Sequence, residues 1–285
     1  WYIKSSEQGY PLAKNNLSHF HYNGEIVDQN FANYFKLLCE AATAGFSMST
    51  NGIANFYFDI DTDKNRSYEW TIKAAKQGSA AAQNNLGWMY GTGNGVDLDY
   101  NEAFKWYRKS ADQGDDWGQF NLALMYMDGR GVSSDYFIAH DWYKKSANQG
   151  HTGAFNNLGL DYKTGLMYGD SKGNIIKSDY REAVKWLDKG IEFGCATCAS
   201  MLYEIYIEKN NINADPVYLN KLYNPKLAVE SLELGDEMGY EMAPSMLGSI
   251  YLTGDNSIEQ DLKKALFWFH KSEEKYQDSF SQGQL

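Results

Sequence analysis

The sequence predicts an all-α protein, a right-handed superhelix (solenoid) of about seven helix pairs. Three recurring features lead to this prediction: a glycine that returns about every 36 residues, a stripe of small and apolar residues after it, and a tryptophan before it. The glycines that set the register are Gly9, Gly45, Gly78, Gly114, Gly150, Gly194 and Gly239. One such unit cannot bury its apolar face alone, so we expect the units to stack in a single array over residues 1–285.

The first helix of each unit is predicted from three positions that share one helical face. Four residues past the closing glycine the residue is small: Ala13, Ser49, Ala82, Gly118, Ala154, Cys198 and Ala243. Eight past it is aliphatic: Leu17, Ile53, Leu86, Leu122, Leu158, Leu202 and Leu247. Twelve past it stands His21 or a tyrosine: Tyr57, Tyr90, Tyr126, Tyr162, Tyr206 and Tyr251. A second glycine should end this helix in five copies, whereas Ile60 and Lys209 replace it in the other two.

The second helix of each unit is predicted to begin at a capping aspartate and to pack through a tryptophan. The aspartates are Asp99, Asp135, Asp179 and Asp261. The tryptophans are Trp1, Trp70, Trp106, Trp142, Trp186 and Trp268, several with alanines on the same face. Because large side chains pack against small ones where helices approach closely, we interpret all six tryptophans as core residues.

These motifs resemble the Sel-one-like repeat (SLR) family, an α-solenoid class related to tetratricopeptide repeats. The resemblance rests on AAAQNNLGWMYGTGNGV at 80–96, FNLALMYMDGRGV at 120–132 and NNLGLDYKTG at 156–165, together with EAFKWYRKSADQG and AHDWYKKSANQG. It covers essentially the whole chain. Proteins of this family are mostly adaptors for other proteins, often in bacterial envelopes, secretion systems and host interaction, and the resemblance implies such a role here.

The remaining sequence features limit the partner and the compartment. The net charge of −11 favours solubility, argues against nucleic acid, and suits a basic protein partner. No apolar run is long enough to insert in a membrane. Loop insertions are expected within 166–178 and 209–225. Because Trp1 already occupies the tryptophan position of a second helix, we expect about ten residues of that helix upstream. Localisation stays open, with the periplasm or secretion slightly favoured over the cytoplasm.

Several apparent chemical motifs are better explained by the repeat. Cys195 and Cys198 form a Cys-x-x-Cys, but Cys198 fills the small buried position, so a local disulfide or redox pair is the less favoured alternative. Asp59 to Asn65 presents oxygens at alternate positions but lacks the glycine and glutamate of a calcium loop, which favours capping. Ser272 and its neighbours resemble a penicillin-binding motif only in isolation. We therefore expect no catalytic residue, metal or cofactor.

Three function classes remain, in this order: an adaptor that binds a protein or peptide in its concave groove, an immunity protein that occludes a bacterial toxin or secretion effector, and a hydrolase of the penicillin-binding kind. The predicted binding face lies opposite the core stripe of the first helices. Trp88 and Trp117 fall on this face in consecutive copies, near Phe120. Asn84, Asn156 and Lys163 are the predicted polar contacts. Two alternatives stay open: the asparagines tie adjacent helices together, and the tryptophans bury each other.

Overall fold

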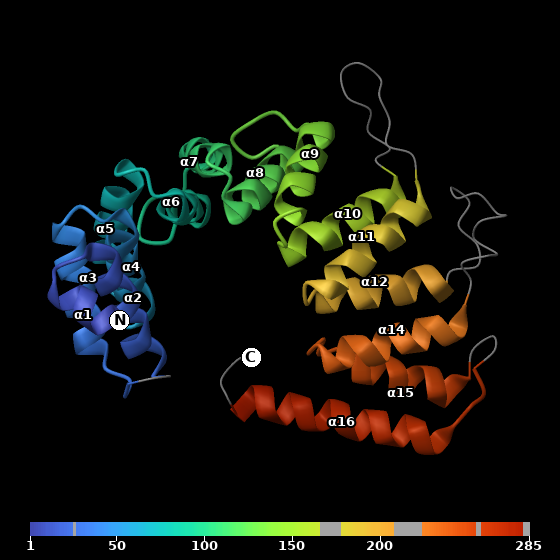
Figure 1. Ribbon diagram of the computed structural model, residues 1–285. Coiled ribbons are helices and arrows are strands. Elements are labelled where there is room, and N and C mark those ends of the chain that lie inside the picture. Colours follow the sequence, from blue (N-terminus) through green and yellow to red (C-terminus); the bar gives the residue numbers. More distant parts are fainter. Residues whose placement is uncertain (25–26, 166–177, 208–223, 255–257, 282–285) are drawn as a thin grey trace. The chain divides into compact units, whose positions relative to one another are not determined.

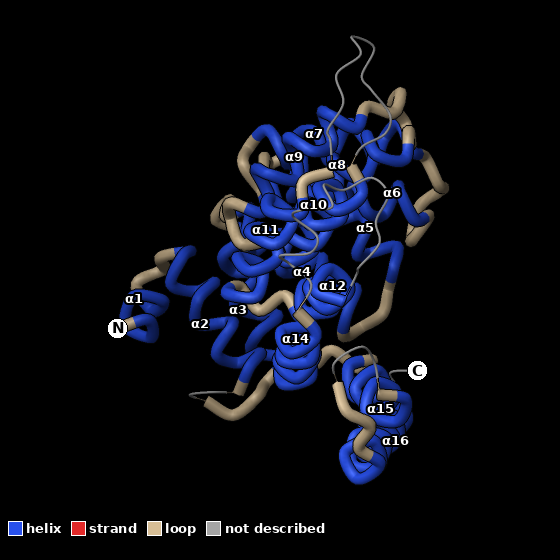
Figure 2. Tube along the Cα trace, turned by 90° about the vertical axis from the view of Figure 1, so that its right-hand side faces the viewer, coloured by secondary structure: helices blue, strands red, loops and turns tan. Residues whose placement is uncertain are grey.

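The computed structural model describes residues 1–24, 27–165, 178–207, 224–254 and 258–281, with side chains as far as Lys275. Every regular element within these ranges is an α-helix, and there are fifteen of them (Figures 1 and 2). The all-α prediction is confirmed. The chain divides into two compact units, Trp1–Trp142 and Tyr143–Leu285, each with its own helix pairs. A single array over the whole chain stays a prediction.

The first unit holds a short helix followed by helix pairs that pack in sequence order. Its helices are α1 (Tyr2–Glu7), α2 (Pro11–Asn23), α3 (Phe31–Thr43), α4 (Ser47–Asp59), α5 (Lys64–Lys76), α6 (Ala80–Thr92), α7 (Tyr100–Asp112) and α8 (Asp116–Asp128). α2 packs on α3, α4 on α5 and α6 on α7, and α6 also contacts α8 of the next pair. α9 (Tyr136–Ala147) spans the boundary between the units.

The second unit repeats this arrangement. Its helices are α10 (Thr152–Thr164), α11 (Tyr180–Glu192), α12 (Ala196–Ile207), α14 (Pro225–Glu237), α15 (Ala243–Thr253) and α16 (Leu262–Ser281). α10 packs on α11, α12 on α14 and α15 on α16, the last three helices following one another in Figure 1. The insertion at 166–178 lies outside the described residues except for Ser178, and that at 209–225 except for Asn224 and Pro225.

The helix ends lie where the repeat predicts them. Asp99, Asp179 and Asp261 each accept two hydrogen bonds from backbone N–H groups of the first helical turn, and Asp135 does the same for α9. Asp63 caps α5 in this way, which confirms capping for that aspartate. All seven closing glycines have φ between 85° and 97°, the left-handed region that glycine tolerates best. Where Ile60 replaces the turn glycine, its φ is −108° and Thr62 takes the positive φ instead. Lys209 lies outside the described residues.

The predicted stripe forms the core of both units. Ile53, Leu86, Leu122, Leu158 and Leu247 have no exposed surface, Leu202 has almost none, and Leu17 is only partly buried. The small residues four positions earlier are buried as well, so the backbones of paired helices approach closely. These positions confirm the register of the repeat.

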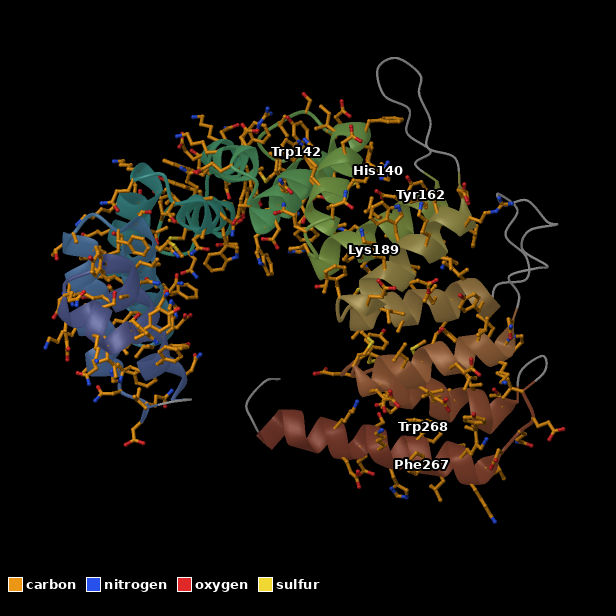
Figure 3. All side chains as sticks on the ribbon, in the orientation of Figure 1. His140, Trp142, Tyr162, Lys189, Phe267 and Trp268 are labelled. Carbon is orange, nitrogen blue, oxygen red and sulfur yellow. A yellow bond between two sulfur atoms is a disulfide. The ribbon has the colours of Figure 1, made fainter. Side chains whose placement is uncertain are left out.

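Five of the six predicted core tryptophans are partly buried, and one prediction was wrong. Trp70 and Trp106 pack on core clusters of the first unit, and Trp268 packs on the cluster of the second unit that contains Leu232 and Leu247 (Figure 3). Trp1 is fully exposed. It precedes α1, a six-residue helix that packs against α2, and no described helix covers the face that carries Trp1.

A lysine three residues after the tryptophan covers the indole ring in at least four of the repeats that the structure describes. The ammonium nitrogen lies 4.3 Å from the ring centroid for Lys73 over Trp70 and 3.9 Å for Lys109 over Trp106. In the second unit the distances are 5.4 Å for Lys189 over Trp186 and 5.1 Å for Lys271 over Trp268 (Figure 3 labels Lys189 and Trp268). These are cation–π contacts between neighbouring turns of one helix.

Cys195 and Cys198 are joined by a disulfide, with their Cα atoms 5.4 Å apart. The sequence favoured this alternative less, because Cys198 occupies the small buried position. Both descriptions hold, since Cys198 is fully buried and a Cβ on Gly190 of α11 would lie 2.6 Å from its Sγ. The glycine therefore makes room for the sulfur.

Candidate partner-binding groove

A groove of about 460 Å³ opens on the first unit, between the first helices of three consecutive pairs. We call it the asparagine–tryptophan groove. Its lining residues are Asn51 and Asn55 from α4, Ala81, Asn84, Asn85 and Trp88 from α6, Asp115 before α8, and Trp117 and Asn121 from α8. Six of them lie opposite the buried stripe of their helices, on the face where the sequence predicts a partner, whereas Asn85 and Asn121 flank that face and Asp115 precedes α8.

The two tryptophans expose their rings to solvent at this groove. Trp88 is 36% exposed and Trp117 is 57% exposed, so they do not bury each other. The ring of Trp88 packs against that of Phe58 of α4, with the centroids 5.4 Å apart and the ring planes nearly perpendicular. A cavity of about 210 Å³, lined in part by Phe58, Asn55 and Trp88, adjoins the groove. The aromatic surface of the groove is therefore partly packed against Phe58 and partly exposed to solvent.

Asparagine side chains link neighbouring repeats along the groove. Asn85 donates to the Oδ1 atoms of Asn51 and Asn55, both at 3.3 Å. Asn121 donates to Oδ1 of Asn84 at 2.9 Å. In the preceding repeat, the hydroxyl of Ser49 donates to Oδ1 of the buried Asn15 at 2.9 Å. The alternative that asparagines tie adjacent helices together is thus confirmed, and the same amides of α4, α6 and α8 line the groove.

Asp115 supplies the charge of the groove. It is the N-cap residue of α8, where its Oδ2 accepts hydrogen bonds from the N–H of Gly118 at 2.7 Å and the hydroxyl of Ser110 at 2.9 Å. Of the described residues that line the groove, Asp115 alone is charged. The site is therefore aromatic, rich in amides and weakly acidic.

Three of the six predicted contact residues meet at this groove, namely Asn84, Trp88 and Trp117. Phe120 lies on α8 but is partly buried and is not part of the lining. Asn156 and Lys163 lie on α10 in the second unit. There the ammonium group of Lys163 is 2.7 Å from a carboxylate oxygen of Glu204, and its side chain is only 15% exposed. A partner-binding role for any of the six stays a prediction.

Six lining residues are not among the predicted contacts: Asn51, Asn55, Ala81, Asn85, Asp115 and Asn121. A signal for three of them was present. An asparagine stands six residues past the closing glycine at Asn15, Asn51, Asn84 and Asn156, and seven past it at Asn16, Asn85, Asn121 and Asn157. Asn55 and Asp115 have no such pattern. The positions that correspond to Asn55 in the other repeats carry no asparagine, and those that correspond to Asp115 carry no aspartate.

The second unit has a larger concavity of about 630 Å³, lined by residues of α14 and α15 and by the segment that leads into α16. Four carboxylates and two lysines line it, and Lys226 lies 3.6 Å from Glu230 in an ion pair. Burial and the neighbouring Glu230 and Glu237 raise the pKa of Glu233, against the opposing effect of Lys264. Because its charges are mixed and it holds none of the predicted residues, we place the candidate site at the asparagine–tryptophan groove.

The described residues set two further limits on function. None of the described helices is long and apolar enough to cross a membrane. Among the same residues, His, Cys, Asp and Glu side chains nowhere gather in threes that would hold a metal ion.

Comparison with known proteins identifies the family and the fold. A Sel1 repeat protein from Oxalobacter formigenes superposes with a TM-score of 0.61 at 25% identity, covering 94% of this chain and 89% of that one. A protective antigen present in uropathogenic Escherichia coli strains, with an SLR fold, gives a TM-score of 0.62 at 25% identity over 96% of this chain. This chain spans only 63% of the length of that antigen.

A more distant likeness is that to an immunity protein from Pseudomonas aeruginosa, with a TM-score of 0.50 and 13% identity over 78% of this chain and 82% of that one. It shows the fold alone. No curated protein matches the chain. The Sel1 repeat model matches residues 11–46, 51–79, 80–115, 118–151, 157–192 and 243–275, well over half of the sequence. The chain therefore belongs to the Sel1 repeat family.

Proposed function

We propose that this protein is an interaction scaffold that binds a segment of another protein in the asparagine–tryptophan groove, and that it acts by binding and not by catalysis. The observation that carries the proposal is the exposure of Trp88 and Trp117 in one groove. Tryptophan is enriched among the residues that dominate binding energy, and exposed aromatic side chains gathered on one face commonly mark a binding site.

The second candidate is an immunity protein that occludes a bacterial toxin. The likeness to the Pseudomonas aeruginosa immunity protein is one of fold, and the net charge of −11 suits a basic toxin equally well. Both candidates require a protein partner. They differ in what that partner is, and a single stoichiometric toxin partner in the native cell would favour immunity over a general adaptor.

Selection from a phage library of random linear peptides tests the proposal and does not require that the natural partner be identified first. The wild-type chain is the bait, and Trp88→Ala and Trp117→Ala are parallel baits. Trp1→Ala is the matched control, because Trp1 is an exposed tryptophan outside the groove. We expect a common peptide motif on the wild type and on the control, and its loss on both groove variants.

Two results would count against the proposal. A motif that survives both groove substitutions would place binding elsewhere on the molecule. Turnover of a substrate without any protein partner would overturn the scaffold function itself.

A further inference from the structure

We infer that the bound segment is an extended peptide with a lysine or arginine, whose side chain lies along Trp88 and Trp117 and whose charge faces Asp115. This inference rests on the proposed function and adds the chemistry of the partner.

The amide groups of the groove match an extended backbone. The three hydrogen bonds among Asn51, Asn55, Asn84, Asn85 and Asn121 use carbonyl oxygens of three residues and N–H groups of two. They leave amide N–H groups on Asn51, Asn55 and Asn84 and carbonyl oxygens on Asn85 and Asn121. An extended peptide presents one N–H and one C=O per residue, so donors and acceptors of both kinds are what it requires.

The charge of the groove selects a cation. Asp115 uses Oδ2 for the helix cap, and a carboxylate has about four lone-pair positions, so Oδ1 remains able to accept from a ligand. The adjoining cavity is lined by Asp59 and, among its described residues, by no lysine or arginine. A basic side chain would therefore meet a carboxylate without a competing cation in the lining of the groove.

The same chain already covers tryptophan rings with lysine. In at least four of the described repeats an ammonium nitrogen lies 3.9–5.4 Å from an indole centroid. A cation over an indole face is attracted by the ring quadrupole, while the alkyl stem of lysine or arginine packs on the apolar ring. Trp88 and Trp117 offer this surface from two consecutive repeats, at the groove that also holds the carboxylate.

The spacing of the repeats sets the spacing of the motif. Packed helices lie roughly 8–10 Å apart, and an extended chain advances about 3.3 Å per residue. One step from α6 to α8 therefore corresponds to about three residues of peptide. We expect the basic residue and a second contact residue to recur about three positions apart in the selected peptides.

The test uses the peptide that the phage selection enriches most, synthesised with blocked ends, and a copy in which its Lys or Arg is replaced by Gln. Binding is measured by fluorescence anisotropy. Asp115→Asn removes the charge but keeps a good helix cap, and Asp99→Asn makes the same change at the cap of α7, outside the groove. We expect Asp115→Asn to weaken the basic peptide about three- to fivefold, the scale of an exposed ion pair, and added salt to do likewise. Asp99→Asn should have no effect, and the Gln copy should be insensitive to Asp115→Asn.

The outcomes separate this inference from the proposed function. Selected peptides that depend on Trp117 but carry no basic residue, or whose affinity ignores Asp115→Asn, overturn the inference and leave the scaffold function standing. If no selected peptide depends on the tryptophans, both fail. The indole N–H signals of Trp88 and Trp117 are also followed by NMR with chitotetraose, a neutral oligosaccharide. Saturable shifts with chitotetraose, when no selected peptide produces them, would assign the groove to a glycan and overturn the inference.

Discussion

Single residues of the core could be predicted because the same core position recurs in every repeat. Leu122 lies at an offset that is aliphatic in every copy, and the structure buries it completely. Trp1 shows the limit of this reasoning, because it holds the tryptophan position of the register and is nevertheless fully exposed. Asp236 shows a second limit. Nothing in the repeat predicts that its buried carboxylate is held by Lys271 and Lys275, which approach it from α16.

Leu122→Ala tests the register of the core. Removing a fully buried leucine side chain loses its burial and leaves a cavity, so the free energy of unfolding should fall by about 2–5 kcal/mol. Leu98→Ala is the control, since Leu98 is 55% exposed and should change stability by less than about 0.5 kcal/mol. Urea unfolding followed by circular dichroism measures both. Similar small losses in the two variants would mean that Leu122 is not a core residue.

Asp236 should make stability depend on acid pH. Burial alone would raise the pKa of its carboxyl, but hydrogen bonds and charge from Lys271 and Lys275 outweigh burial and lower the pKa below its ordinary value. A lowered pKa in the folded state stabilises the fold above the ordinary value of about 3.9, and this stabilisation disappears as the pH falls through the folded pKa. We expect Asp236→Asn to cost about 1–3 kcal/mol at neutral pH and to flatten the stability profile below pH ~4.

Urea unfolding of wild type and Asp236→Asn between neutral pH and pH ~3 measures this dependence. Glu230→Gln is the control, because the Lys226–Glu230 pair is exposed and worth little. Parallel pH profiles for wild type and Asp236→Asn would contradict the assigned ion pair.

At the scale of elements, the helix boundaries could be predicted from aspartates that cap helix starts and glycines that adopt positive φ after helix ends. The loops between paired helices were less predictable. Gly131 illustrates why. Its φ of 68° is a local property that the sequence suggests, whereas its contact with the backbone of α7 depends on the packing of two repeats and cannot be predicted from the local sequence. A Cβ at Gly131 would overlap the carbonyl oxygen of Tyr100, which shows that this turn packs directly on the preceding repeat.

Gly131→Ala and Gly114→Ala separate these two effects. Both glycines have positive φ, but a Cβ at Gly114 meets no atom within 4 Å. Gly114→Ala should cost about 1–2 kcal/mol from backbone strain alone. Gly131→Ala should cost a further ~1–3 kcal/mol, because the turn must move away from α7. Thermal unfolding of both variants measures the difference, and equal melting temperatures would show that the turn does not pack on the preceding repeat.

At the scale of the whole molecule, the repeat predicted seven helix pairs and the family model recognises six of them. The pair that it passes over, α12 and α14, is nevertheless packed like the others. The binding face was predicted in part. Trp88 and Trp117 stood out because they leave the structural register, but the amides that complete the groove come from neighbouring repeats. The pairing of the asparagines depends on how α4, α6 and α8 are placed. The sequence of a single repeat does not determine that placement.

The measurement that tests the scaffold function most directly is the affinity of Trp117→Ala for the selected peptide, taken together with its melting temperature. Trp117 is 57% exposed, so its removal should leave the melting temperature nearly unchanged while binding weakens by more than about 1 kcal/mol. Unchanged affinity, or a variant that unfolds instead, would contradict the claim that the asparagine–tryptophan groove is where this protein holds its partner.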